Sequence, residues 1–499
     1  MRKKYSILVL IILLFILTFF SDTHEKETTP INKIESNPYN NQYIIKANLN
    51  TADKIINAVQ QVIYVNNTGI ELEEIYFHVY PNSFKTEETA PVEEYNPRFI
   101  PGYTDIVSLE AATDKGKIAL KHEIMGRDGT ILRIELPYNI KPSENIVLDM
   151  KYIVHIPPAR YRFGYGDITI NLDNWYPIAA VYDDKGWNIE RYYSIGEPFY
   201  SDAADYKVSI EAPKEYTIAS TGFLIEEKAE DGRTVWSFEA NSVRNFALIA
   251  CDRYKVLEKN IDGILVKSYF YSYDEKYGKI ALEHGIRAIK AFNQEFGSYP
   301  YPSFSIVEAD CPQGIELSGM VCINDLYYYN DSVFQITKWR ILKEPFKRLI
   351  TRGVARQWWY NTVGHDQINE AWLGGGFTRY CEGLFIELER KDEEAGRNFF
   401  WSEVEPNVNS LIGIGDYDIG VYKPLSEFKY IEEYKASVQD KGALLLYSLR
   451  QELGDDIFKE ILRQYYSKYK FKNASTKDFI SICQSISGKN LESFFSKWL

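Results

Sequence analysis

The sequence contains few of the residues that usually bind transition metals. Only six of its 499 residues are histidine, and none of the six has a second histidine four residues further along the chain. Two imidazoles one helical turn apart are a common zinc-binding arrangement, so the sequence lacks that kind of site. The histidines are His24, His78, His122, His155, His284 and His365.

Cysteine is also sparse, with five residues and no Cys-x-x-Cys pair. This excludes a thiolate zinc site of the usual spacing and a scaffold held together by many disulfides. The spacing of Cys311 and Cys322 is compatible with a single bridge, which the sequence leaves open.

Positive charge is in deficit, because 57 Lys and Arg residues face 70 Asp and Glu residues, for a net charge of -13. Such a surface repels nucleic acid, and we exclude nucleic-acid binding on this ground. With 45% hydrophobic and 15% aromatic residues, the chain is rich enough in apolar side chains to fold into two or three domains.

The N-terminus carries an export pattern. Arg2, Lys3 and Lys4 precede an apolar run from Ser6 to Phe20, so residues 1–21 are predicted to be a signal anchor or signal peptide. As a helix the run would span about 22 Å, less than the roughly 30 Å hydrocarbon core. No small-residue cleavage site follows it, which favours an uncleaved anchor.

The anchor implies a place in the cell. With its basic end in the cytoplasm, the protein would be a single-pass protein of the cell membrane with its folded part outside the cytoplasm. If the segment is cleaved, the protein would be secreted. Residues 22–42 are polar and punctuated by Pro and Asn, which is typical of a linker.

The folded part divides into two halves of different character. Residues 43–255 alternate polar and apolar side chains in short runs separated by turn residues, which predicts a β-sandwich-like domain. Residues 256–499 contain segments with helical periodicity, such as "YGKIALEHGIRAIKAFNQEFG", and two strand-like runs. They predict a mainly helical α+β domain.

Six short motifs then occur in a characteristic order: "EFGSYPYPSFSIVEAD", "GIELSGM", "RGVARQWW", "NEAWLGGGFTRYCEG", "QDKGALLLYSLRQELG" and "FFSKWL". Their order and spacing resemble the aminopeptidase N family of zinc metallopeptidases, and "GEPFYSDAADYKVSIEAPKEYTIASTG" resembles that family's N-terminal domain. The resemblance implies an aminopeptidase-like β-rich domain followed by a thermolysin-like peptidase domain.

The same resemblance locates the residues that would hold zinc. The family uses His-Glu-x-x-His and then, after eighteen residues, a glutamate. Here Arg352 and Arg356 stand at the histidine positions and Gly353 at the general base, while residues 357–374 separate them from Gly375 at the glutamate position. Gln439 occupies the position of the family's tyrosine.

These replacements remove the chemistry that the resemblance implies. A guanidinium has no lone pair to offer a metal, and without a metal no bound water is activated. The resemblance therefore leads us to expect zinc as the family's cofactor and its loss from this chain.

The arginines admit two interpretations. Arg348, Arg352 and Arg356 recur every four residues, and this periodicity alone favours a solvated basic face opposite a buried apolar face. The resemblance instead places that face in the cleft. On this interpretation Gly353 and Gly375 leave space into which the guanidinium groups fold, and the former metal site becomes a cationic pocket.

Two carboxylates are expected to balance that charge. Glu316, with Gly314, matches the family's segment for the substrate's amino end, and Glu382 matches a carboxylate just behind the metal ligands. We expect Arg352 or Arg356 to pair with one of them. The substrate-binding residues would then be Gly314, Glu316, Arg352 and Arg356.

Three functions remain open at this point. The sequence favours a non-catalytic relative that binds a peptide or another small anion-bearing ligand, with Glu316 holding an amino terminus and the arginines a carboxylate. An active metallo-aminopeptidase would need a non-standard metal site, for example from Glu316, Glu370 and Glu382. The chain would otherwise be a structural or interaction module of a membrane protein complex, such as a transporter.

Overall fold

The computed structural model of the protein describes residues 35–91, 99–328, 335–412 and 417–499. The predicted signal segment, residues 1–21, and most of the predicted linker, residues 22–42, lie outside these ranges. Within the described ranges, no helix has both the length and the apolar character needed to cross a membrane.

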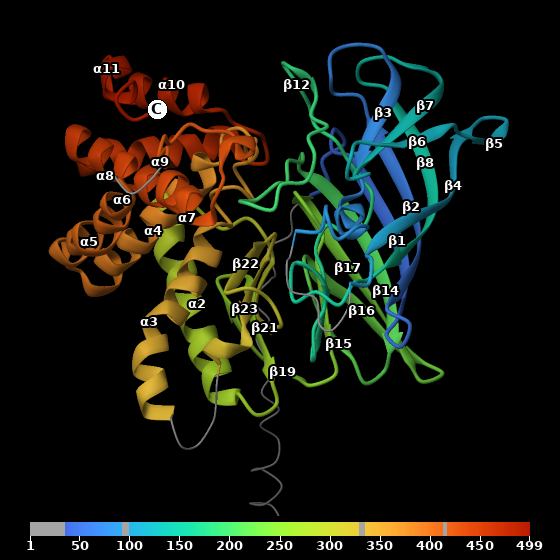
Figure 1. The fold of residues 1–499 in the computed structure, drawn as a ribbon, viewed down its shortest axis with the longest axis horizontal. Coiled ribbons are helices and arrows are strands. Elements are labelled where there is room, and N and C mark those ends of the chain that lie inside the picture. The colour runs from blue at the N-terminus through green and yellow to red at the C-terminus, as the bar shows by residue number, and fades with distance from the viewer. Residues whose placement is uncertain (1–34, 92–98, 329–334, 413–416) are drawn as a thin grey trace, which may run out of the picture.

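A β-rich half and a helical half lie side by side, as the sequence predicts (Figure 1). The β-rich half is built on an eight-stranded sheet in which β1 is parallel to β14 and antiparallel to β2. In sheet order its strands are β16 (Phe223–Glu230), β17 (Arg233–Val243), β14 (Ala204–Pro213), β1 (Gln42–Asn50), β2 (Ile55–Val65), β8 (Asn145–His155), β4 (Tyr103–Thr113) and β5 (Gly116–Ala119).

Smaller sheets accompany it. One contains β11 (Ile178–Ala179), β3 (Leu72–His78), β7 (Ile131–Ile140) and β6 (His122–Met125). Another contains β15 (Thr217–Ser220), β18 (Leu248–Cys251), β10 (Thr169–Leu172) and β9 (Phe163–Tyr165), and a two-stranded ribbon contains β12 (Tyr182–Asp183) and β13 (Gly186–Trp187). The 3₁₀ turn η1 (Tyr80–Phe84) follows β3.

The second half begins with a five-stranded sheet. Its order is β19 (Tyr254–Ile261), β20 (Ile264–Tyr271), β21 (Ser303–Ala309), β23 (Met320–Asn324) and β22 (Gly314–Leu317). The predicted change of domain at residues 255/256 falls inside β19, which pairs with β20 as a hairpin. The cysteines of this region, Cys311 and Cys322, are free and buried.

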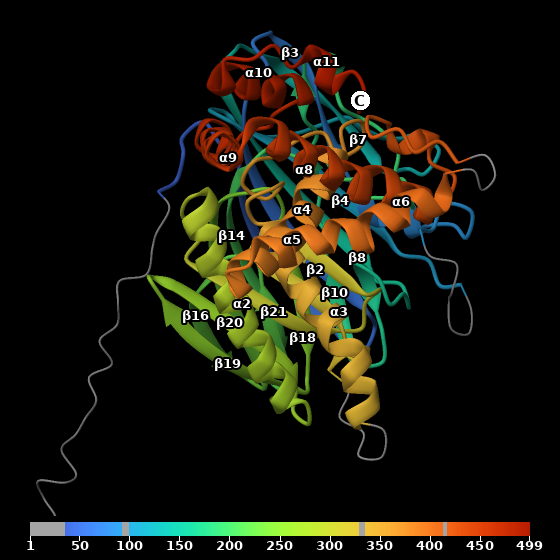
Figure 2. The ribbon, with the colours of Figure 1, turned by 90° about the vertical axis from the view of Figure 1, so that its left-hand side faces the viewer.

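Helices α2 and α3 contact this sheet. Helix α4 contacts α3 and also packs against α5 and α8, and these helices belong to the cluster that the later helices form (Figure 2). The α-helices are α2 (Glu275–Phe296), α3 (Gln335–Ala355), α4 (Trp372–Arg390), α5 (Glu393–Phe399), α6 (Glu405–Leu411), α7 (Ile431–Tyr434), α8 (Gly442–Leu453), α9 (Asp455–Tyr469), α10 (Thr476–Ser487) and α11 (Glu492–Phe495). The π-helices are η3 (Phe400–Val404) and η5 (Lys435–Lys441), and the 3₁₀ turns are η2 (Asp325–Tyr327) and η4 (Leu425–Glu427).

Side-chain periodicity explains these elements. In β2, buried side chains alternate with more exposed ones along most of the strand, so one face of the sheet packs on the core. In α2 the buried residues recur at helical spacing and face the sheet. A single cluster of buried apolar side chains runs from Tyr43 in β1 to Phe495 in α11, so the two halves share one core.

One fully buried arginine joins the halves. The Arg244 guanidinium, from the loop between β17 and β18, donates hydrogen bonds at 2.5–2.8 Å to the carbonyl oxygens of Ser201, Tyr360 and Lys472 and to Oδ1 of Asn473. Gly364 lies against it so closely that a Cβ there would overlap the guanidinium. The hydrogen bonds to Ser201 and Tyr360 are buried and those to Lys472 and Asn473 are partly buried, so losing the guanidinium leaves several acceptors without a donor.

We predict that Arg244→Met lowers the free energy of unfolding by about 3 kcal/mol, because buried acceptors left without donors each cost about 1–3 kcal/mol. Urea denaturation followed by tryptophan fluorescence measures the change. Arg253→Met is the matched control, because Arg253 is half-exposed and pairs with its neighbour Asp252. Equal stabilities of the two variants would contradict this role for Arg244.

Candidate functional site

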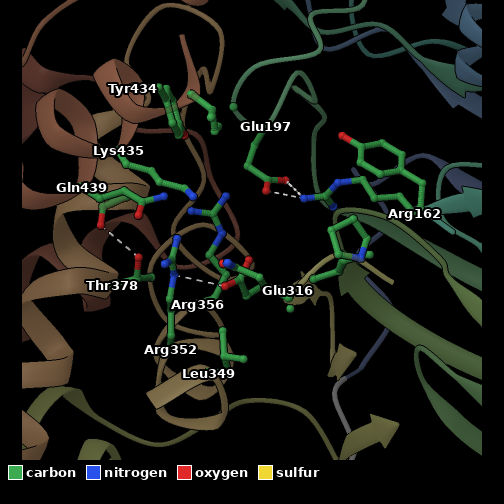
Figure 3. Close-up of a pocket in the computed structure, with 18 of the residues that line it drawn as sticks. Arg162, Glu197, Glu316, Leu349, Arg352, Arg356, Thr378, Tyr434, Lys435 and Gln439 are labelled. Carbon is green, nitrogen blue, oxygen red and sulfur yellow. Dashed lines mark hydrogen bonds and ion pairs between the residues drawn. The ribbon is translucent and has the colours of Figure 1, made fainter. Parts of the chain in front are cut away.

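A pocket of about 420 Å³ lies between the two halves and receives side chains from both (Figure 3). Its volume is in the range of small-molecule and peptide sites. All four residues predicted to bind a ligand line it, namely Gly314, Glu316, Arg352 and Arg356. Gly375 and Gln439, which the resemblance aligns with the family's glutamate ligand and tyrosine, line it as well.

Arg352 pairs with Glu316, as predicted. Arg352 is in the last turn of α3 and Glu316 is in the edge strand β22, with 3.2 Å between Nε and Oε1. Both side chains are largely buried, at 25% and 11% exposed. The pair therefore forms one wall of the pocket.

Arg356 follows the end of α3 and is 6% exposed. Its Nη2 donates a hydrogen bond to Oε1 of Gln367, and its guanidinium stacks on Tyr360 at 4.8 Å from the ring centroid. A Cβ at Gly374 would overlap Arg356 Nη1, so the glycine makes room for the guanidinium. Unlike Arg352, Arg356 forms no ion pair with a carboxylate of the described residues.

The space expected at Gly353 and Gly375 is not used by the arginines. A Cβ at Gly353 would overlap the side chain of Val321 in β23, and one at Gly375 would lie 2.7 Å from Cγ1 of Val438. Both glycines permit close packing of helices against neighbouring apolar groups. The prediction that Gly353 and Gly375 make room for the arginines was therefore wrong. Gly374, the residue before Gly375, makes room for Arg356.

Glu382 does not balance the pocket arginines either. It accepts a hydrogen bond at 2.6 Å from Arg379, one helical turn earlier in α4, and Arg379 also bonds Asp440 at 2.7 Å. Arg348 turns away from the pocket and pairs with Glu403. The three arginines of the predicted basic face therefore have different partners: Arg348 pairs with Glu403, Arg352 pairs with Glu316, and Arg356 donates a hydrogen bond to Gln367.

The β-rich half contributes a second arginine–glutamate pair. Arg162 bonds Glu197 with one Nη atom and lies 3.2 Å from Oδ2 of Asp173 with the other. Burial raises the pKa of Glu197, while the Arg162 guanidinium opposes this shift and Arg356 does so more weakly. The two halves therefore interact electrostatically across the pocket.

The π-helix η5 forms another wall of the pocket. It begins at Lys435 and carries Gln439, and Tyr434 precedes it at the end of α7. Lys435 points into the pocket and forms no ion pair with the described carboxylates (Figure 3). Gly196 has a φ of +83°, and a Cβ there would lie 2.9 Å from the Tyr434 ring, so a glycine lets the β-rich half approach this wall.

The lining side chains carry excess positive charge. Arg162, Arg352, Arg356 and Lys435 supply four positive charges, and Glu197 and Glu316 supply two negative ones, for a lining charge of +4 − 2 = +2. Asp173 lies behind Arg162 and offsets part of this excess. The residual charge is concentrated on Arg356 and Lys435.

His365 lies in the loop between α3 and α4. It is 1% exposed, and its Nε2 has no hydrogen-bond partner among the described residues. Burial and then the Arg356 charge hold its pKa well below the usual range. His365 is therefore neutral beside Arg356 and adds no positive charge.

The residues at the family's zinc positions do not fit zinc. Arg352 and Arg356 offer only donors, and Gly375 has no side chain. The alternative carboxylates are separated, since Glu370 accepts a hydrogen bond from the backbone N–H of Thr476 while Glu382 is held by Arg379. In the described part of the chain, no three His, Cys, Asp or Glu side chains gather as a metal site.

Several pocket residues were missed by sequence reasoning. Glu197 lies in the "GEPF" motif that carries the family resemblance, and this motif could have indicated that Glu197 lines the pocket. Arg162 and Lys435 carry no comparable signal, because they reach the pocket through the packing of distant segments.

Comparison with known proteins supports this architecture. The model of the peptidase family M1 domain matches residues 280–498. Aminopeptidase M1-D of Oryza sativa subsp. japonica is 23% identical over 302 residues, covering 59% of this chain and 34% of that protein. Aminopeptidase N of Lactococcus lactis subsp. lactis is 24% identical over 451 residues, covering 82% and 52%. The chain thus spans between about a third and about half the length of these curated relatives.

Solved structures share the fold over nearly the whole chain. The M1 zinc metallopeptidase of Deinococcus radiodurans has a TM-score of 0.64 and 14% identity, covering 94% of this chain and 95% of that chain. A mutant of an M1 zinc metallopeptidase from that organism, bound to a Tyr-Ser-Ala substrate, has a TM-score of 0.62 and 13% identity, covering 92% and 94%. With the motifs and the two-half fold, these comparisons support the aminopeptidase N-like family for this chain, and they place a peptidase family M1 domain at residues 280–498.

Proposed function

We propose that this chain is a pseudopeptidase, which binds a peptide or another small anion-bearing ligand in its pocket and does not hydrolyse it. One observation carries the proposal: guanidinium groups stand where the family has its metal ligands, and they line an accessible pocket. A positive pocket of this volume suits a ligand with an anionic group, because guanidinium binds carboxylates through paired hydrogen bonds.

The loss of catalysis follows from the same residues. Gly353 has no group to accept a proton from water, and Gln439 has no phenolic hydroxyl. Gln439 still faces the pocket, where its amide can donate a hydrogen bond. The pocket therefore retains means to bind a ligand but lacks the groups that activate water.

We further propose that the protein works outside the cytoplasm, tethered to the cell membrane by residues 1–21. The support is the pattern of that segment, in which basic residues precede an apolar run, as in export signals. Cleavage of the segment would make the protein a secreted one.

We predict that the full chain binds Tyr-Ser-Ala, and that Arg352→Ala combined with Arg356→Ala weakens binding at least about tenfold, since a bond to a charged group contributes about 1.5–3 kcal/mol. Isothermal titration calorimetry measures the affinity. Arg348→Ala is the matched control, because Arg348 is on the same helix and pairs with Glu403. Unchanged affinity in the double variant, with its thermal stability retained, would contradict the proposal.

We predict that the purified full chain contains far less than one zinc per molecule and does not cleave alanine p-nitroanilide. Guanidinium groups cannot bind the ion, and no replacement cluster of ligands exists in the described residues. Mass spectrometry gives the metal content, and absorbance gives the cleavage rate. Stoichiometric zinc together with chelator-sensitive cleavage would show that the chain is an active peptidase.

A further inference from the structure

We propose that the pocket recognises the carboxylate end of its ligand and not a free amino end. This inference rests on the proposed function, since it assumes that the pocket binds a ligand, and it specifies which group of the ligand is bound. It also replaces the sequence-based expectation that Glu316 holds an amino terminus.

The first argument is that Glu316 is already neutralised. Its carboxylate lies 3.2 Å from Nε of Arg352, and only 11% of the side chain is exposed. An incoming ammonium would have to compete with a guanidinium that the protein itself holds in place by covalent connection. A ligand ammonium therefore gains little at Glu316.

The second argument is that the other pocket carboxylate is equally engaged. Glu197 accepts hydrogen bonds from Nη2 of Arg162 with both of its oxygens. The same guanidinium also contacts Asp173 and stacks over the Phe199 ring at 5.3 Å from its centroid, so it is fixed in position. No carboxylate that lines the pocket is left without a cationic partner in the described residues.

The third argument is that two cations have no such partner. Arg356 has five N–H donors, and its hydrogen bond to Gln367 uses one of them. Lys435 has three donors and points into the same pocket. Neither residue forms an ion pair with a carboxylate of the described chain, so their charges are available to a ligand.

The position of Arg356 is also fixed before any ligand arrives. Gln367 accepts a hydrogen bond from one edge of the guanidinium, and the Tyr360 ring stacks against its face. The backbone of Gly374 packs directly against it. Such preorganisation lowers the entropic cost of binding. Arg356 and Lys435 are like charges that face the same pocket, so they repel each other, and a bound carboxylate offsets that repulsion.

The test compares three peptides on the full chain by calorimetry: Tyr-Ser-Ala, N-acetyl-Tyr-Ser-Ala, and Tyr-Ser-Ala with a C-terminal amide. We expect the acetylated peptide to bind within about threefold of the free peptide. We expect the amide to bind at least about tenfold more weakly, since it loses a charge-assisted bond.

Two substitutions sharpen the comparison. Glu316→Gln should increase the affinity for Tyr-Ser-Ala, because the substitution frees Arg352 for the ligand. Lys435→Gln should weaken binding of Tyr-Ser-Ala and leave binding of the amide unaffected. Lys429→Gln is its matched control, because Lys429 is exposed and does not line the pocket.

The outcomes separate this inference from the proposed function. Loss of binding on acetylation, or a tenfold weakening by Glu316→Gln in a folded protein, would show that the pocket holds an amino end, and only the carboxylate inference would fail. If none of the three peptides binds the wild-type chain, the proposed peptide-binding function itself fails, and the inference fails with it.

Discussion

The buried guanidinium of Arg244 is the contact on which the geometry of the molecule depends. It comes from the β-rich half and saturates backbone oxygens of the helical half, beneath a glycine that admits no side chain. Because the pocket takes its walls from both halves, the distance between Arg162 on one side and Arg356 on the other depends on this joint. A fixed separation is what allows charges from the two halves to act on one ligand.

The positions that resemble the family's zinc site line this pocket, and they carry positive charge. A zinc site would hold a cation supplied from solution and coordinated by protein lone pairs. Here the protein supplies the positive charge covalently, through Arg352 and Arg356, and satisfies part of it with Glu316. The charge of Arg356 is not paired with a carboxylate among the described residues. On the proposed function, this arrangement is suited to retaining an anion.

The fold was predictable from the sequence because its motifs are local patterns in a fixed order. The Arg352–Glu316 pair was predictable for the same reason, since both residues belong to motifs. The expectation that Glu382 is a counter-charge to the pocket arginines was wrong, because Arg379, three residues earlier in the same helix, pairs with it. Arg162 and Lys435 were not predicted, because their approach to the pocket depends on how distant segments pack. Sequence patterns reveal neighbours within an element better than neighbours across a cleft.

A crystal structure of the full chain grown with Tyr-Ser-Ala tests the central claim most directly, because it shows what occupies the former metal site. The account predicts the peptide's terminal carboxylate within hydrogen-bonding distance of Arg356 and Lys435, with the Arg352–Glu316 pair intact. A peptide ammonium bound to Glu316 with that pair broken, or a metal ion coordinated in the pocket, would contradict it.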